Sequence, residues 1–252
     1  MSDLKAIRFE SASVKSLQNR GTTAKEWIIP NLLPLGISTL CAPRNIETYQ
    51  ITMQLCISVC HGKAFLGHPT NKAGCLYLTS KERYSALQKN MHKVLKGDAI
   101  PENFYVGHGS DLSKNALMAG LEEELNVHPE IQVIVIEDIE KIIKLPKKSE
   151  MNYAANYSLI SSLKALSDRK NISILFIHDI DVRKTAHKGS PFDLIDFSDA
   201  IVSSANTVFI LQKGKKDDET AVLSVAGQDV AEKSIVIRFN KQSFRGEIVD
   251  TN

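Results

Sequence analysis

Two hydrophobic patterns alternate along the chain. Short runs rich in β-branched and other apolar residues predict strands, at Ile37–Cys41, Gly74–Thr79, Asn103–Gly107, Ile131–Glu137 and Ile172–His178. Between them lie longer segments whose apolar residues recur three or four positions apart, and these predict helices over Glu47–His61, Glu82–Lys96, Leu112–Val127 and Asn152–Arg169. Because strands that alternate with helices form a parallel sheet, the pattern predicts an α/β fold.

The predicted strands differ in how much of their surface is apolar. Val133–Ile136 and Ile174–Ile177 are apolar at every position, as in strands buried on both faces. Helices must therefore cover both sides of the sheet, which makes three layers. After residue 205 the pattern changes to strand-like runs separated by short polar turns, at Thr207–Gln212, Ala221–Val225 and Ser234–Phe239. These runs predict a C-terminal antiparallel edge.

The length of the chain agrees with one domain of this class. The chain has 252 residues, of which 43% are hydrophobic, enough to bury a full core. Length alone also allows two small domains, but the sequence shows no repeat and no low-complexity linker. We expect an N-terminal extension over residues 1–26 and a single α/β domain over residues 27–252.

Charge and hydropathy narrow the environment and the partners. Charged residues make up 24% of the chain and the net charge is +2, so no overall field attracts nucleic acid or an anionic membrane. DNA binding therefore requires a local basic patch. The N-terminus carries charged residues from Asp3 onward, and no run reaches the roughly 18 apolar residues of a spanning helix. We expect a cytoplasmic protein without a membrane partner.

The four cysteines favour reduced core thiols over a metal site. Cys41 and Cys75 lie in strand-like runs, whereas Cys56 and Cys60 are four positions apart in a helical segment, next to His61. A zinc site needs four converging ligands, and this spacing does not supply them. We expect no bound metal.

The turn after the first predicted core strand is the first place to look for chemistry, because ligands bind at the carboxyl ends of parallel strands. A phosphate-binding loop there would read G-x-x-x-x-G-K-[ST], with glycines that let backbone N–H groups wrap the phosphates and a hydroxyl that holds magnesium. The turn instead consists of Ala42, Pro43, Arg44, Asn45, Ile46, Glu47, Thr48 and Tyr49. It contains neither glycine nor lysine.

The segments around this turn nevertheless follow a known order. Trp27-Ile-Ile-Pro-Asn-Leu-Leu-Pro-Leu-Gly36 precedes the strand Ile37–Cys41, and later stretches lie at Ser190–Ile195, Ala205–Val208 and Gly227–Val230. In these features, over residues 27–240, the chain resembles the RepA-like branch of the RecA superfamily, which comprises hexameric replicative helicases. The resemblance implies a RecA-like P-loop ATPase fold in three layers.

Every chemical position of the family's phosphate loop is changed in this chain. Ala42 stands at the first glycine, Glu47 at the second, Thr48 at the lysine and Tyr49 at the serine or threonine. Glu47 places a negative charge where phosphates would lie, and Thr48 removes the neutralising ammonium. The resemblance therefore implies a degenerate Walker A loop and no bound nucleotide. A phosphate site that uses Arg44 is the alternative.

Two strand ends correspond to further catalytic positions of the family. After Cys75–Thr79, Lys81 stands where the family has the carboxylate that activates water, with Glu82 next to it. Ile131–Glu137 resembles the Walker B strand, with Glu137 in place of the usual Asp and Asp138 beside it. The resemblance makes both carboxylates candidates for a magnesium ion. A role in capping the next helix is the structural alternative.

Of two later positions, one matches the family and one differs from it. His178, at the end of its strand, matches the first of two paired histidines, and Gln228 replaces an arginine. A hydrogen-bonded core histidine is the alternative for His178.

The resemblance implies a pseudo-ATPase that acts as a scaffold, ring subunit or partner-binding module in plasmid, phage or mobile-element DNA replication or mobilisation. We expect a homo-oligomer or a protein partner from a replication complex. The apolar segment Trp27–Leu35 is expected outside the core strands, docked on a neighbouring subunit, although it serves as a local staple if it folds against its own domain.

Two alternatives to the pseudo-ATPase stay open. One is a working ATPase or helicase that binds ATP and magnesium through Arg44 and Thr48, with Glu82 or Glu137 as the base. The other is a nucleotide-independent DNA-binding module. Its candidate residues are Arg183, Lys184 and Lys188, in a loop after the strand that ends at His178. A solvated surface loop is the structural alternative there.

This basic loop generates a first prediction. Because few charges contact few phosphates, any binding of single-stranded DNA should be weak, with a slope of about −2 in a plot of log affinity against log salt. Fluorescence anisotropy with a labelled oligonucleotide should show weaker binding for the Arg183→Ala/Lys184→Ala/Lys188→Ala variant than for the wild type. Unchanged affinity in the triple variant would place the binding site elsewhere.

Overall fold

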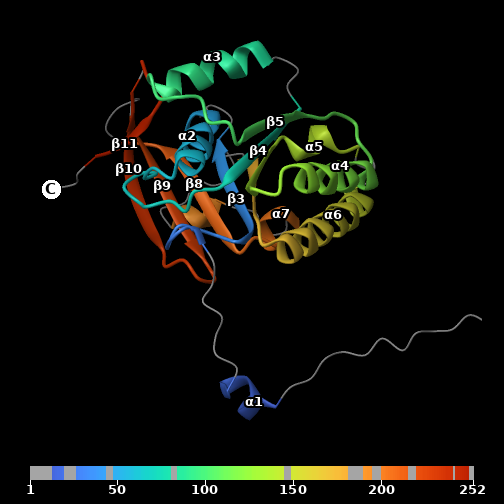
Figure 1. Cartoon of the computed structure of the whole chain (residues 1–252). Coiled ribbons are helices and arrows are strands. Elements are labelled where there is room, and N and C mark those ends of the chain that lie inside the picture. Colours follow the sequence, from blue (N-terminus) through green and yellow to red (C-terminus); the bar gives the residue numbers. More distant parts are fainter. Residues whose placement is uncertain are drawn as a thin grey trace, which may run out of the picture.

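The computed structural model describes residues 13–19, 27–43, 48–80, 84–144, 149–180, 190–194, 200–214, 220–240 and 242–249. A nine-stranded sheet runs through the domain in the order β11-β10-β9-β8-β3-β7-β6-β4-β5 (Figure 1). Its parallel strands are β3 (Gly36–Pro43), β4 (Gly74–Thr79), β5 (Phe104–His108), β6 (Ile131–Glu137), β7 (Ser173–Ile180) and β8 (Thr207–Lys213). The antiparallel edge consists of β9 (Thr220–Gly227), β10 (Lys233–Phe239) and β11 (Gly246–Ile248).

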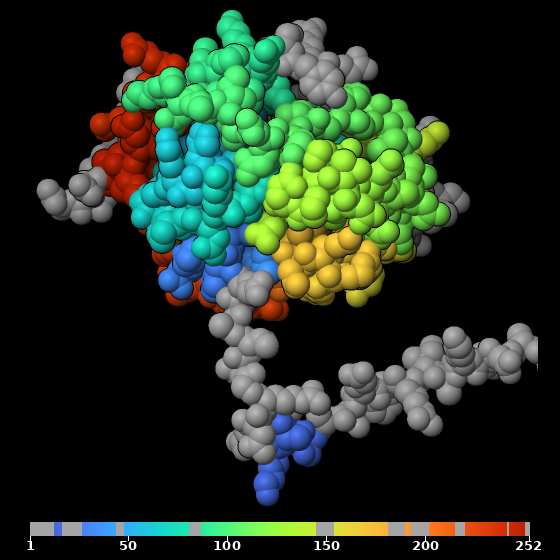
Figure 2. All heavy atoms as spheres, in the orientation of Figure 1, coloured from blue at the N-terminus to red at the C-terminus, as the bar shows by residue number. Residues whose placement is uncertain are grey.

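Helices cover both faces of this sheet. One face packs on α2 (Thr48–His61) and α3 (Tyr84–Leu95), and the other on α4 (Lys114–Val127), α6 (Ser149–Lys170) and the short α7 (Ala200–Ser203). Shorter elements are α1 (Val14–Asn19), α5 (Ile139–Ile142) and the 3-10 helix η2 (Pro191–Leu194). Figure 2 shows α4 and α6 in contact on the surface, with the C-terminal strands on the opposite side. The predicted three-layered α/β fold with an antiparallel C-terminal edge is confirmed.

Apolar burial explains why the central strands form where they do. Every residue of β4 is buried, and β3 is buried from Gly36 to Ala42. Neighbouring residues of β6 pack on opposite faces of the sheet: Val133 and Val135 face the α2 side, whereas Ile134 and Ile136 face α4 and α6. A strand in this position needs apolar residues at every step.

The segment Trp27–Leu35 lies outside the strands of the main sheet, as expected, but it folds against its own domain, in agreement with the alternative to docking on a neighbouring subunit. It forms a small antiparallel hairpin of β1 (Trp27–Ile29) and β2 (Leu33–Pro34). Ile28, Ile29, Leu32 and Leu33 are at most 1% exposed and belong to the core beneath α2. Asn71 fastens the hairpin by donating its side-chain N–H to the Trp27 carbonyl at 2.6 Å. The hairpin is therefore a local staple.

The C-terminal turn between β10 and β11 is tied to α3. Arg245 donates to the carbonyls of Val94 and Leu95 at the end of α3 and to the Asp98 carboxylate at 3.0 Å. These bonds satisfy carbonyl groups that a helix end otherwise leaves without a partner. Beside it, Gln54 of α2 bonds both to the N–H and to the carbonyl of Gly246. The antiparallel edge is thus bound to the two helices of one face.

The hairpin generates a second prediction. Replacing the fully buried Ile29 with Ala should lower the free energy of unfolding by about 2–5 kcal/mol, because it removes apolar contacts and leaves a cavity. Val127→Ala, at a position 65% exposed, should change it by no more than about 0.5 kcal/mol. Urea unfolding monitored by circular dichroism measures both. Equal effects would mean that the hairpin is not part of the cooperative core.

Candidate functional site

The candidate site lies where the chain changes direction across the sheet. After β3 the chain passes through α2 on one face, whereas after β7 it passes through η2 and α7 on the other face before forming β8. In an open α/β sheet such a switch opens a crevice at the carboxyl ends of the strands. In this chain the corresponding position is the ends of β3 and β7, where Ala42 pairs with Asp179 and Pro43 with Ile180.

The turn that would bind phosphate connects β3 to α2. The strand ends at Pro43 and the helix begins at Thr48. Of the predicted loop, Arg44, Asn45, Ile46 and Glu47 lie outside the described residues. Ala42 is 1% exposed in the core, and the hydroxyl of Thr52 donates to the carbonyls of Thr48 and Tyr49. The first turn of α2 is therefore stabilised by a side chain of the same helix.

Tyr49 packs on the C-terminal turn. Its ring lies 6.4 Å from that of Phe244, centroid to centroid, in an edge-on arrangement. The ammonium of Lys93 lies 3.9 Å from the centroid of the Phe244 ring. Thus Tyr49, which we expect at the position of the magnesium-binding hydroxyl, contacts Phe244 of the C-terminal turn, and Phe244 in turn contacts Lys93 of α3.

Glu137 is the best-defined polar group at the carboxyl edge. It is 6% exposed at the end of β6, and its Oε2 accepts hydrogen bonds from the Tyr77 hydroxyl at 3.2 Å and from the Thr79 hydroxyl at 3.0 Å. Both donors belong to β4, the neighbouring strand, and are two residues apart, which places them on one face. The buried carboxylate is thereby satisfied by the protein itself.

The environment of Tyr77 keeps its hydroxyl protonated. Burial raises the pKa of Tyr77 well above its usual value, and the Glu137 carboxylate raises it further, whereas a hydrogen bond with Thr52 acts in the opposite direction. A protonated phenol is the form that can donate to a carboxylate. Tyr77 and Glu137 thus connect β4 and β6 through a buried hydrogen bond.

Asp138 has a local structural role. Its backbone is left-handed, with φ 56°, at the start of α5, and its side chain makes no capping bond to that helix. Its Oδ2 accepts from Lys141 at 2.9 Å and from the Ser80 hydroxyl at 3.5 Å. Asp138 therefore occupies the N-cap position of α5, but its side chain does not cap the helix. Lys81 and Glu82, which follow Ser80, lie outside the described residues.

His178 lies at the end of β7, beside Cys41 of β3 in the parallel register. It is half-buried, and the next residue, Asp179, is exposed. Arg183, Lys184 and Lys188, the DNA-binding candidates, lie outside the described residues. The structure thus brings His178, Glu137 and Asp138 to one edge of the sheet. With β7 between β3 and β6, the turn and Glu137 are two strands, or about 10 Å, apart.

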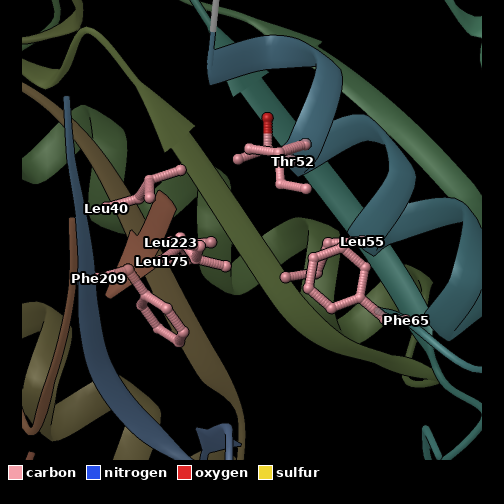
Figure 3. Close-up of a pocket in the computed structure, with 8 residues that line it drawn as sticks. Leu40, Thr52, Leu55, Phe65, Leu175, Phe209 and Leu223 are labelled. Carbon is pink, nitrogen blue, oxygen red and sulfur yellow. The ribbon is translucent and has the colours of Figure 1, made fainter. Parts of the chain in front are cut away.

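One cavity among the described residues is too small for a nucleotide. It lies between α2 and the sheet, has a volume of about 20 Å³, and is lined by the hydroxyl-bearing Thr52 together with Leu40, Ile51, Leu55, Phe65, Leu175, Phe209 and Leu223 (Figure 3). Ligand pockets typically measure about 300–1,000 Å³. This cavity is an apolar packing gap beneath α2.

The described part of the chain holds no group of three or more His, Cys, Asp or Glu residues arranged for a metal ion. Cys41, Cys56, Cys60 and Cys75 are buried free thiols. Burial raises the pKa of the Cys75 thiol well above its usual value, and its neighbours Cys56 and Cys60 raise it further. Among the described helices, none combines the length and apolar character needed to cross a membrane.

Comparison with known proteins assigns the chain to a family. A family model described as "AAA domain" matches residues 4–184, from the N-terminal segment to just beyond β7. This chain belongs to the AAA domain family. The matched region contains the turn after β3, the Glu137 edge and His178, whereas β8 to β11 lie beyond it. No curated protein matched the chain.

Solved structures agree with this AAA domain assignment at the level of the fold. The chain is similar to a solved ATPase domain, with a TM-score of 0.64 and 10% identity over 86% of this chain and 85% of that chain. It is equally similar to a DnaB-like replicative helicase that was solved to show its interactions with primase, again with a TM-score of 0.64 and 10% identity. There it covers 86% of this chain and 58% of the helicase chain. The predicted RecA-like ATPase fold is confirmed.

Two residues of the site, Tyr77 and Thr79, escaped the sequence analysis. The signal was present: they are the polar positions near the end of the apolar run Gly74–Thr79, two residues apart and hence on one face. What the sequence did not show is that β6, with Glu137, is the strand next to them.

The bond between Tyr77 and Glu137 generates a third prediction. Tyr77→Phe should lower the free energy of unfolding by about 1–3 kcal/mol, because a buried carboxylate loses a donor. In a double-mutant cycle with Glu137→Gln, the two effects should not add. Urea unfolding at pH 7 measures both, with Tyr157→Phe, at a position 55% exposed, as the control.

Tyr77→Phe should also change how the free energy of unfolding depends on pH. Above about pH 10, Tyr77 ionises in the unfolded chain but stays protonated in the folded one, so its contribution to stability is full below that pH and falls above it. Wild type should therefore lose stability more steeply above pH 10 than Tyr77→Phe. Additive single effects together with identical alkaline slopes would contradict the buried bond.

Proposed function

We propose that this AAA domain protein does not hydrolyse ATP and acts as a scaffold or ring subunit in the replication or mobilisation of plasmid, phage or other mobile-element DNA. The observation that carries the proposal is Glu137. Its Oε2 already accepts two hydrogen bonds, from Tyr77 and Thr79. A metal ion at Oε2 would have to displace both donors.

The composition of the turn supports the same conclusion. Phosphate binding needs N–H groups that converge on the anion and a cation that neutralises it, and glycine-poor backbone is poorly suited to such wrapping. Residues 42–49 contain no glycine or lysine, and Glu47 adds a negative charge. At about 4 Å, two like charges repel by about 4 kcal/mol near a protein surface. Arg44 is the single positive charge in the turn.

The role in replication rests on similarity of fold. One of the two similar structures is described as a replicative helicase that interacts with primase, and the other as an ATPase domain. A fold of this kind without ATP chemistry retains surfaces for assembly and partner binding, which is why a scaffold or ring subunit fits best.

Calorimetric titration with ATP and magnesium provides the fourth prediction. Because the loop lacks its phosphate ligands, we expect no saturable heat, which corresponds to a dissociation constant above about 1 mM. Phosphate release should not exceed that of a blank, and Glu137→Gln should not change it. A RecA-like ATPase with an intact loop, titrated in the same buffer, is the positive control.

A micromolar dissociation constant would contradict the proposal and favour the working ATPase. In that case Glu82→Gln and Glu137→Gln identify the base, since hydrolysis should stop in the variant that lacks it. DNA binding without ATP binding would instead favour the nucleotide-independent DNA-binding module.

A further inference from the structure

One face of the sheet carries a row of helices that ends before the sheet does. On this face α7 packs near β8 and β3, α6 contacts β3 and β7, and the leucines of α4 pack with β4 and β6. Neighbouring helices of the row contact each other, α7 with α6 and α6 with α4. Beyond α4 the sheet continues to its edge strand, β5. No helix of the described chain covers that face of β5.

The usual spacing of strands and helices indicates where the next helix of the row would lie. Strands repeat at about 4.8 Å and packed helices at about 8–10 Å, so one helix covers about two strands. The next position in the row therefore lies over β5 and alongside α4. A groove of about 300 Å³ occupies this position, which we name the β5–α4 groove.

The floor and one wall of the β5–α4 groove are apolar and carry few bulky side chains. Leu76 and Leu78 of β4 line it together with Gly107 of β5. A Cβ atom at Gly107 would come within 3.0 Å of the Leu78 side chain, so a larger residue than glycine would crowd Leu78 here. On α4 the lining includes the small residues Ala116 and Gly120, and a Cβ added at Gly120 meets no atom within 4 Å. The backbone of another helix can approach closely here.

The opposite wall is a fixed aromatic ring. Tyr105 of β5 lines the groove, and its hydroxyl donates to the Glu130 carboxylate at 2.6 Å. Its ring stacks on His128 at a centroid distance of 3.9 Å. The bond to Glu130 raises the pKa of Tyr105 to about 12, so the hydroxyl remains a donor at neutral pH. A ring fixed by a hydrogen bond at its hydroxyl and by stacking on its face is a preformed contact surface.

The charged rim of the groove is acidic. Glu123 and Glu124 of α4 line it and are exposed. Neither has an ion-pair partner among the residues that the structure describes, whereas the adjacent Glu122 pairs with Arg169 of α6 at 2.6 Å. The Glu122 carboxylate, toward α6, is thus neutralised, whereas the two carboxylates that line the groove are not. A molecule that binds in the groove should therefore carry positive charge.

We propose that the β5–α4 groove docks a basic amphipathic helix of a partner protein. Its apolar side chains would cover Leu76 and Leu78, and its lysines or arginines would lie beside Glu123 and Glu124. The groove is distinct from the turn after β3, so docking does not depend on whether that turn binds ATP. It would complete the helical layer over the edge strand.

The fifth prediction uses a labelled helical peptide made only of leucine and lysine, with leucines on one face, titrated against the full chain by fluorescence anisotropy. We expect saturable binding that weakens with salt and is unchanged by ATP. Gly120→Leu should weaken it at least about tenfold, or about 1.4 kcal/mol, by filling the groove. That substitution should not destabilise the helix, since leucine has a higher helix propensity than glycine.

Matched controls keep the test specific. Ala119→Leu adds the same side chain on the same helix outside the groove, and Glu232→Lys reverses an exposed charge elsewhere; both should bind like wild type. Glu123→Lys/Glu124→Lys should lose binding. Equal binding by all variants, or equal binding of a leucine–glutamate peptide, would overturn the proposal. So would self-association that Gly120→Leu abolishes, because the occupant would then be a second copy of the chain.

Discussion

The double-sided parallel pairing of β3 is the constraint on which the rest of the domain depends. This strand pairs with β7 along all eight of its residues and with β8 over Ser38–Cys41, while helices cover both of its faces. Its carboxyl end, and hence the start of α2, is placed by this pairing and by apolar burial. None of that stabilisation requires a particular sequence in the turn itself. The fold therefore does not depend on which residues the turn contains.

The polar groups at the carboxyl edge follow the same logic. A carboxylate that loses a metal ion remains costly to bury unless other donors replace it. Glu137 receives such donors from Tyr77 and Thr79 of β4. At the surface of α2, Tyr49 packs on Phe244. The edge where a nucleotide would bind is thus used to connect helices and strands.

Most of the sheet could be predicted from the sequence because continuous apolar runs mark strands buried on both faces. The bounds of β4 and β6 were predicted to the residue. The β1–β2 hairpin was missed, since strands of three and two residues around Pro30 show no periodicity, and their burial depends on the core they meet. The partners of Glu137 were missed for a related reason: which strands lie side by side is a property of the topology.

We propose that Glu137 is a structural carboxylate and that the turn after β3 binds no phosphate. A crystal structure tests both claims most directly. The crystals would be grown with magnesium and a non-hydrolysable ATP analogue. We predict no density for phosphate at residues 42–49, with Glu137 Oε2 still bonded to Tyr77 and Thr79. A triphosphate held at that turn, with magnesium at Glu137 or Asp138, would contradict this role.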